Sequence, residues 1–100
     1  MNLIDLDIAN TIRDQIGNKA LVMIGASNYV AIKKGIRFNI GKNENQVTHI
    51  EVYLNVHDLY DVTFYNCGAN QLNVISKTEG VYFAELAEVI EEGTGMRTNL

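Results

Sequence analysis

An alternation of apolar and polar side chains over Thr48–Val56 places the strongest constraint on how this chain folds. Neighbouring side chains of a β-strand point to opposite faces, so the alternation predicts a strand with one buried face and one wet face. The apolar set is Ile50, Val52, Leu54 and Val56, and the polar set is His49, Glu51, Tyr53 and Asn55. The chain has 100 residues, of which 47% are hydrophobic. We therefore expect one domain over residues 1–100, because half-chains would be too small to bury separate cores.

Shorter apolar segments on both sides of this stretch predict further strands joined by tight turns. The predicted strands are Ala20–Ile24, Tyr29–Ile32, Ile36–Ile40, Asp61–Tyr65 and Leu72–Ile75. Ala20–Ile24 is continuously apolar, which is typical of a strand buried on both faces. The predicted turns are Gly25–Asn28, Lys33–Gly35, His57–Tyr60 and Asn66–Asn70. Turn signals recur about every 8–12 residues, so neighbouring strands should pair antiparallel in a meander.

Helical periodicity appears at both ends of the chain. Isoleucine recurs every fourth residue in Leu3–Ile16, which lines one face of a helix that Asn2 or Asp5 would cap and Gly17 would end. A second helix is predicted over Gly80–Glu92. Its expected apolar face is Phe83, Leu86, Ala87 and Ile90, its expected N-cap is Thr78 or Glu79, and its expected stop is Gly93, with Met96 and Leu100 packing onto the core.

Together these elements predict an α+β fold. We expect a five- or six-stranded, mainly antiparallel sheet with the N-terminal and C-terminal helices packed on one face. Cys67 is the single cysteine, so no disulfide within the chain supports the fold. No apolar run approaches the roughly 18 residues that span a bilayer, and the first residues lack the basic region of a signal peptide, so we expect a cytoplasmic protein with no membrane contact.

The two histidines do not favour a metal site. His49 and His57 would lie about 26 Å apart on a straight strand of roughly 3.3 Å per residue, and no cysteine–histidine spacing typical of zinc is present. We therefore expect no metal and no cofactor.

His57 and Asp58, with Asp61 nearby, resemble a base with an orienting carboxylate. No serine lies in a GxSxG-type turn, and the alternative role of Asp58 and Asp61 is to accept backbone N–H bonds in the turn. An enzyme with a site around His57 is accordingly the third hypothesis. It requires His57, Asp58, Tyr60, Asp61 and Cys67 to converge.

Charged residues are unevenly distributed. Half of the basic residues fall within one predicted hairpin: Lys33, Lys34, Arg37 and Lys42. This hairpin also holds Tyr29 and Phe38, so it is a candidate for anion or nucleic-acid binding. Its structural alternative is a lysine-rich edge that discourages aggregation between sheets.

The predicted C-terminal helix is acidic, since Glu79 precedes a glutamate-rich face made of Glu85, Glu88, Glu91 and Glu92. Such a face is either simply solvated or a surface that meets a basic partner.

Three segments and the ending of the chain resemble a group of small proteins of tailed bacteriophages and bacterial mobile elements. They are residues 18–30, residues 52–64, residues 80–86 and residues 94–100, which together cover much of the chain. The shared residues are core and turn positions. The resemblance therefore implies a context, a small accessory protein in the cytoplasm of a bacterial host, and no catalytic residue.

These observations rank three functions. The leading hypothesis is a non-enzymatic protein-interaction module that binds a host or phage protein, with host takeover or counter-defence as the setting. The alternative is weak nucleic-acid binding through the basic hairpin Lys33–Lys42, and the third is the enzyme around His57. A free sheet edge also suggests a homodimer.

Overall fold

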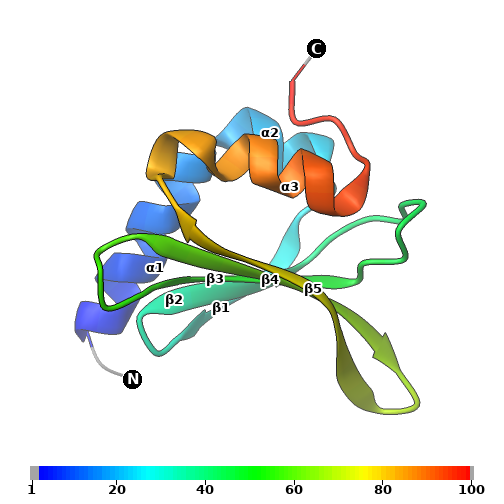
Figure 1. Cartoon of the computed structure of the whole chain (residues 1–100), viewed down its shortest axis with the longest axis horizontal. Coiled ribbons are helices and arrows are strands. Elements are labelled where there is room, and N and C mark those ends of the chain that lie inside the picture. The colour runs from blue at the N-terminus through cyan, green and yellow to red at the C-terminus, as the bar shows by residue number, and fades with distance from the viewer. Residues whose placement is uncertain (1–2, 100) are drawn as a thin grey trace.

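The structure, a computed structural model, describes residues 3–99 and confirms the α+β fold. Five strands form one antiparallel meander sheet in the order β1-β2-β3-β4-β5. The helices lie together on one side of this sheet, and the other side is open (Figure 1). The elements are α1 (Leu3–Ile16), α2 (Asn18–Met23), β1 (Ser27–Ile32), β2 (Gly35–Asn39), β3 (His49–Leu54), β4 (Tyr60–Gly68), β5 (Gln71–Val81), the 3-10 helix η1 (Phe83–Glu85) and α3 (Leu86–Thr94).

Alternation along the strands builds the core. In β3, Ile50 and Val52 pair with Phe64 and Val62 of β4, and all four side chains are almost fully buried under the helices. The intervening residues, such as Glu51 and Thr63, belong to the open face. The predicted division into a buried and a wet face is therefore confirmed over His49–Leu54, but Val56, expected on the buried face, lies beyond the end of β3 and is 89% exposed.

The N-terminal helix agrees with its prediction over Leu3–Ile16. Its buried residues are Ala9, Ile12 and Ile16, whereas Ile4 remains 66% exposed. The first turn of α1 therefore carries apolar side chains that the core does not cover. Gly17, with φ of 95°, ends the helix, and the suggested cap Asn2 lies outside the described residues.

The prediction of a strand over Ala20–Ile24 is wrong, because this segment is helical. The helix α2 begins directly after Gly17, at Asn18 and Lys19. Ala20 and Ile24 are buried four residues apart while Val22 is 69% exposed, so one side of the short helix faces the core. A short apolar run cannot by periodicity alone distinguish a buried strand from a buried helix.

The β4–β5 hairpin is longer than predicted. The expected turn over Asn66–Asn70 shrinks to Ala69 and Asn70, which both have positive φ, and β5 runs on to Val81. The outer part of the hairpin bends away from the helices (Figure 1). Because most of β5 is exposed, its sequence lacks the buried periodicity from which a strand is recognised.

The C-terminal helix starts later than predicted. Thr78 and Glu79 lie in β5 and cap no helix. The helical turn begins after Tyr82, whose backbone N–H donates to a Glu85 carboxylate oxygen at 3.4 Å. Phe83, expected on the buried face, is 59% exposed, and the buried residues of α3 are Leu86, Ile90 and Thr94.

Gly93 does not stop this helix. The helix continues to Thr94 and ends at Gly95, which adopts the left-handed conformation with φ of 76°. A Cβ atom built on Gly93 would overlap the Phe64 ring, so the glycine allows α3 to lie directly on the sheet. Met96 packs against the core as expected, and Leu100 lies outside the described residues. None of the helices in residues 3–99 is long and apolar enough to cross a membrane.

Gly93→Ala should destabilise the protein by about 1–3 kcal/mol, although alanine favours helices more than glycine does. The added methyl group must displace either α3 or the buried Phe64 ring. Urea denaturation of Gly93→Ala and of the neighbouring exposed variant Glu92→Ala measures this effect. Equal stability of both variants and the wild type would contradict the packing described for α3.

Candidate functional site

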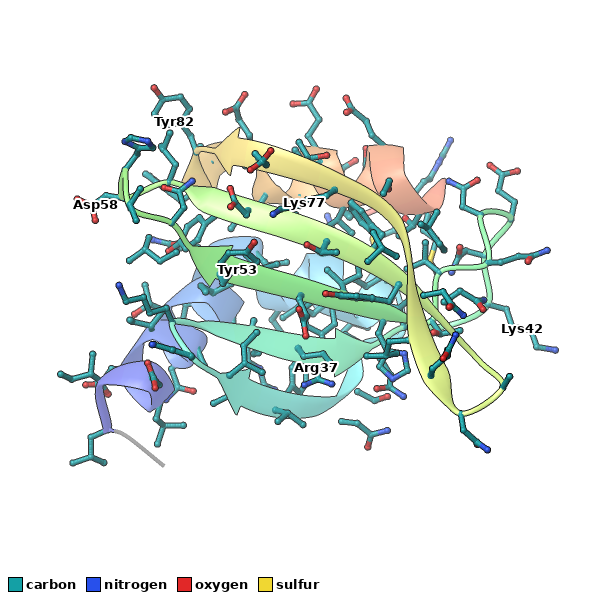
Figure 2. All side chains as sticks on the ribbon, turned by 60° about the horizontal axis from the view of Figure 1, so that its bottom comes forward. Arg37, Lys42, Tyr53, Asp58, Lys77 and Tyr82 are labelled. Carbon is teal, nitrogen blue, oxygen red and sulfur yellow. The ribbon has the colours of Figure 1, made fainter. Side chains whose placement is uncertain are left out.

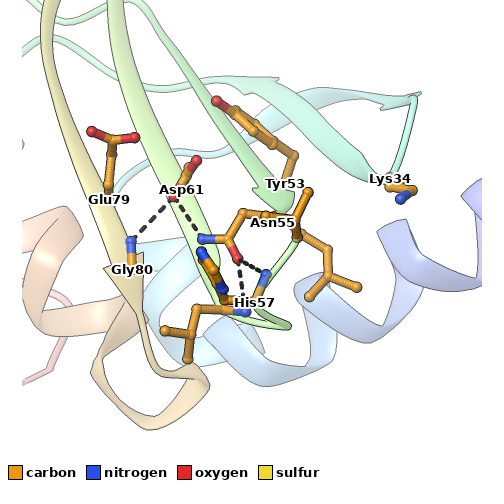
Figure 3. Close-up of a pocket in the computed structure, with 10 residues that line it drawn as sticks. Lys34, Tyr53, Asn55, His57, Asp61, Glu79 and Gly80 are labelled. Carbon is orange, nitrogen blue, oxygen red and sulfur yellow. Dashed lines mark hydrogen bonds between the residues drawn. The ribbon is translucent and has the colours of Figure 1, made fainter.

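A pocket of about 700 Å³ opens at the end of the sheet where the β3–β4 turn meets β5 (Figure 3). Its volume lies within the range of small-ligand sites in proteins. Apolar side chains form part of the wall, and charged or polar side chains surround them. The lining residues are Lys34, Tyr53, Leu54, Asn55, Val56, His57, Leu59, Asp61, Glu79 and Gly80.

The Asn55 side chain holds the β3–β4 turn. Its Oδ1 atom accepts the backbone N–H groups of His57 at 2.8 Å and of Leu59 at 3.2 Å. Asp58 lies at the tip with a positive φ of 59°, a conformation that aspartate tolerates better than most residues. The sequence assigned the turn-holding role to Asp58 and Asp61. It missed Asn55, which the alternation placed among ordinary wet-face residues.

Asp61 connects this turn to the edge strand. One carboxylate oxygen, Oδ1, accepts a hydrogen bond from Asn55 Nδ2 at 3.0 Å and another from the Gly80 backbone N–H at 3.1 Å (Figure 3). Gly80 has a positive φ of 70° and lies where the β4–β5 register shifts. Asp61 thus accepts a backbone N–H as expected, but from a β-bulge in β5 and not from its own turn.

The environment of Asp61 keeps its carboxylate charged. Burial is the largest single influence and raises the pKa of this carboxyl, since the residue is only 6% exposed, whereas the hydrogen bonds from Asn55 and Gly80 lower it. The positive charge of Lys77 and a hydrogen bond with Tyr53 act in the same direction. The net result is a pKa below the ordinary value of an aspartate.

Tyr53 lines the pocket where it adjoins the open sheet face, and Lys77 lies beside Tyr53 on that face (Figure 2). The Lys77 ammonium lies 5.6 Å from the centre of the Tyr53 ring and 3.9 Å from a Glu79 carboxylate oxygen. A hydrogen bond to Tyr53 is the main cause that raises the pKa of Lys77. Both charged groups are largely exposed, so their ion pair adds little stability.

The residues named for catalysis come together only in part. His57 and Asp61 line the same pocket, but the hydrogen bond described for His57 uses its backbone N–H. Tyr60 points to the helix side, where its hydroxyl donates to Gln15 Oε1 at 2.6 Å. Cys67 is exposed near the opposite end of β4. Within residues 3–99, no three His, Cys, Asp or Glu side chains are placed to hold a metal ion.

The four basic residues of the predicted hairpin do not form one patch. Arg37 Nε lies 3.1 Å from a Glu51 carboxylate oxygen, but outside hydrogen-bonding geometry, so charge attraction holds the pair. The Tyr65 hydroxyl donates to the other Glu51 oxygen at 2.9 Å. Lys33 and Lys34 occupy the β1–β2 turn, whereas Lys42 follows the far end of β2, well away from Arg37 (Figure 2).

The glutamates of the acidic helix have different roles. Glu88 and Glu92 are exposed, and Glu85 accepts the Tyr82 N–H. Glu91 accepts the backbone N–H of Thr98 at 2.8 Å and its hydroxyl at 2.7 Å. The backbone hydrogen bond is the main cause that lowers the pKa of Glu91. One member of the predicted partner-binding face therefore anchors the chain after α3.

A second, apolar pocket of about 230 Å³ adjoins the first. It lies between α1 and the sheet, and Leu54 lines both pockets. The lining residues are Ile4, Asp7, Ile8, Thr11, Leu54 and Tyr60. Large apolar side chains are exposed on the segments that line the two pockets or directly follow them in the chain, and we call them the apolar end. They are Leu3, Ile4 and Leu6 of α1, Val56 of the β3–β4 turn, and Tyr82 and Phe83 after β5. Ile4 and Val56 themselves line the pockets.

Comparisons with known proteins leave the site without a precedent. No family model, no curated protein and no solved structure matches this chain. The function must therefore be argued from the geometry of the chain.

Asp61→Asn should destabilise the protein at neutral pH by about 1–3 kcal/mol, because asparagine cannot replace a charged acceptor. The pKa of Asp61 is lowered in the folded state, so its contribution is present above about pH 4 and is lost as the pH falls through the folded-state pKa. Urea denaturation across this range should show a weaker loss of stability in acid for the variant than for the wild type.

Asp58→Asn is the matched control, because it removes one carboxylate from the same turn at an exposed position. We expect its stability to stay within about 0.5 kcal/mol of the wild type. If Asp58→Asn and Asp61→Asn cost the same, the buried carboxylate is not the anchor of this turn.

Proposed function

We propose that this protein is a non-enzymatic protein-interaction module that binds its partner through the apolar end. The exposure of large apolar side chains around two adjoining pockets carries this proposal. Val56 is 89% exposed at the tip of a turn, and Tyr82 and Phe83 are 62% and 59% exposed. Exposed apolar side chains that gather at one end of a molecule beside pockets are typical of interaction sites, and aromatic residues are enriched in such sites.

The apolar end is held in a defined shape before any partner arrives. Asn55 and Asp61 fix the turn that carries Val56, and Asp61 also fixes the bulge that precedes Tyr82. At the first turn of α1, an Asp5 carboxylate oxygen accepts the Lys34 backbone N–H at 3.0 Å. A surface that is ordered in advance loses less conformational entropy when it binds.

Nucleic-acid binding has less support from the geometry. A binding surface for phosphates needs several cations on one face. Arg37 is paired with Glu51, and Lys42 is separated from Lys33 and Lys34 by the length of β2. The enzyme hypothesis lacks the expected convergence, because Tyr60 and Cys67 lie outside the pocket.

Both sheet edges favour a partner other than a second copy of the chain. Edge strands pair readily with further strands unless bulges or charges prevent it. The register of β1 shifts between Ser27 and Val30, and that of β5 shifts twice along its pairing with β4. The resemblance of the sequence to small phage proteins suggests where to look for the partner, among host or phage proteins of a bacterial cell.

Capture experiments with surface variants test the proposal. The tagged wild-type protein should retain a partner protein from a bacterial lysate. The tagged variants Val56→Asp and Phe83→Asp should not retain it, because each new aspartate places a charge in the buried interface. Val22→Asp is the matched control, since Val22 is 69% exposed on α2, away from the apolar end. Retention by all three variants, or loss in the control alone, would overturn the proposal.

A further inference from the structure

The two adjoining pockets differ in chemistry although they share Leu54. The smaller one is walled by Ile4 and Ile8 and suits an apolar side chain. The larger one has Leu59 and Val56 on one side and the carboxylates of Asp61 and Glu79 on another. A single ligand segment that spans Leu54 would therefore meet an apolar pocket and a pocket with negative charge.

Negative charge is concentrated around the apolar end. Six of the twelve acidic residues of the chain lie in the first two turns of α1, in the β3–β4 turn and the start of β4, or between the end of β5 and η1: Asp5, Asp7, Asp58, Asp61, Glu79 and Glu85. The positive charges of the same region are Lys33 and Lys34, while Lys77 already lies beside Glu79 and Tyr53. Such a field attracts cationic groups and repels anionic ones.

We propose that the two pockets bind a segment of a partner protein that presents a Lys or Arg side chain next to an apolar side chain. The apolar side chain enters the pocket between Ile8, Leu54 and Tyr60. The cationic side chain enters the larger pocket on the side of Glu79. This inference rests on the proposed function, since it names the chemistry of the partner that the apolar end binds.

The negative charge of this surface also disfavours three other ligands: a second copy of the chain, a nucleic acid and an anionic lipid surface. A second copy would bring two surfaces of the same predominantly negative charge together. Nucleic acids and anionic lipid surfaces carry the same sign of charge as the rim. A cationic and apolar protein segment complements both properties of the surface.

Positive and negative side chains lie on different sides of the larger pocket. Substitutions of the two charges should therefore have opposite effects on the affinity for a cationic group. Lys34 lines the wall across from Glu79, and Asp61 lies at its base between them (Figure 3). A cationic group near Glu79 gains from that carboxylate and is repelled by Lys34. Removing the two charges should therefore change its affinity in opposite directions.

The test uses a short fluorescently labelled peptide that alternates leucine with arginine, and a matched peptide that alternates leucine with glutamate. Anisotropy titrations should show that the arginine peptide binds the wild type and that salt weakens the binding. Glu79→Gln should weaken it by about threefold to fivefold, and Lys34→Ala should strengthen it by a similar factor. Glu92→Gln and Lys42→Ala, exposed and away from the pockets, are the matched controls.

The results separate this inference from the function on which it rests. The proposal of a cationic segment is overturned if the glutamate peptide binds more strongly than the arginine peptide. It is also overturned if Glu79→Gln and Lys34→Ala change the affinity no more than the control variants do. If lysate capture still depends on Val56 and Phe83 in that case, the apolar end binds a partner of another chemistry. If capture does not depend on them either, the proposed function fails as well.

Discussion

The carboxylate of Asp61 lies buried between two segments that are far apart in the sequence, and the shape of one end of the molecule depends on it. Through Asn55 it fixes the β3–β4 turn, and through the Gly80 N–H it fixes the bulge in β5. A buried charge is costly unless its hydrogen-bonding capacity is filled. Here the donors are in place, and the carboxyl pKa is lowered. The same bonds place Val56 on one side of the larger pocket and the end of β5 on the other.

The open face of the sheet and the apolar end differ in how many contacts their exposed side chains make within the chain. On the open face, Glu51 pairs with Arg37 through charge attraction and accepts a hydrogen bond from the Tyr65 hydroxyl, so these cross-strand neighbours contact one another within the chain. At the apolar end, Val56 and Phe83 extend into solvent next to pockets. Surface that is satisfied internally gains little from a partner, whereas exposed apolar surface gains from burial. This contrast is the reason why we propose the binding site at the end of the sheet and not on its face.

The alternation around Ile50 and the four-residue spacing of isoleucine in α1 were enough to predict the sheet and the first helix, because buried faces repeat with a fixed period. Residues 20–24 were mispredicted, since five apolar residues fit a strand and a buried helix equally well. Gly93 was misread because its role depends on Phe64, which is distant in the sequence. His57, Asp61 and Lys34 were singled out from the sequence, but as members of two separate candidate sites, and the larger pocket brings them together. Other members, such as Leu54 and Leu59, were not singled out, because strand pairing and the position of α1 bring them to the pockets and no local pattern encodes these contacts.

Chemical-shift mapping on the isotope-labelled protein tests the central claim most directly, because it locates the bound segment residue by residue. The protein is titrated with the leucine–arginine peptide, and backbone amide shifts are followed. The account predicts that the shifts are confined to the first two turns of α1, the β1–β2 turn, the β3–β4 turn and the segment from Glu79 to Phe83. Shifts centred on Arg37 and Glu51 of the open face, or on Glu88 and Glu92 of α3, would contradict it.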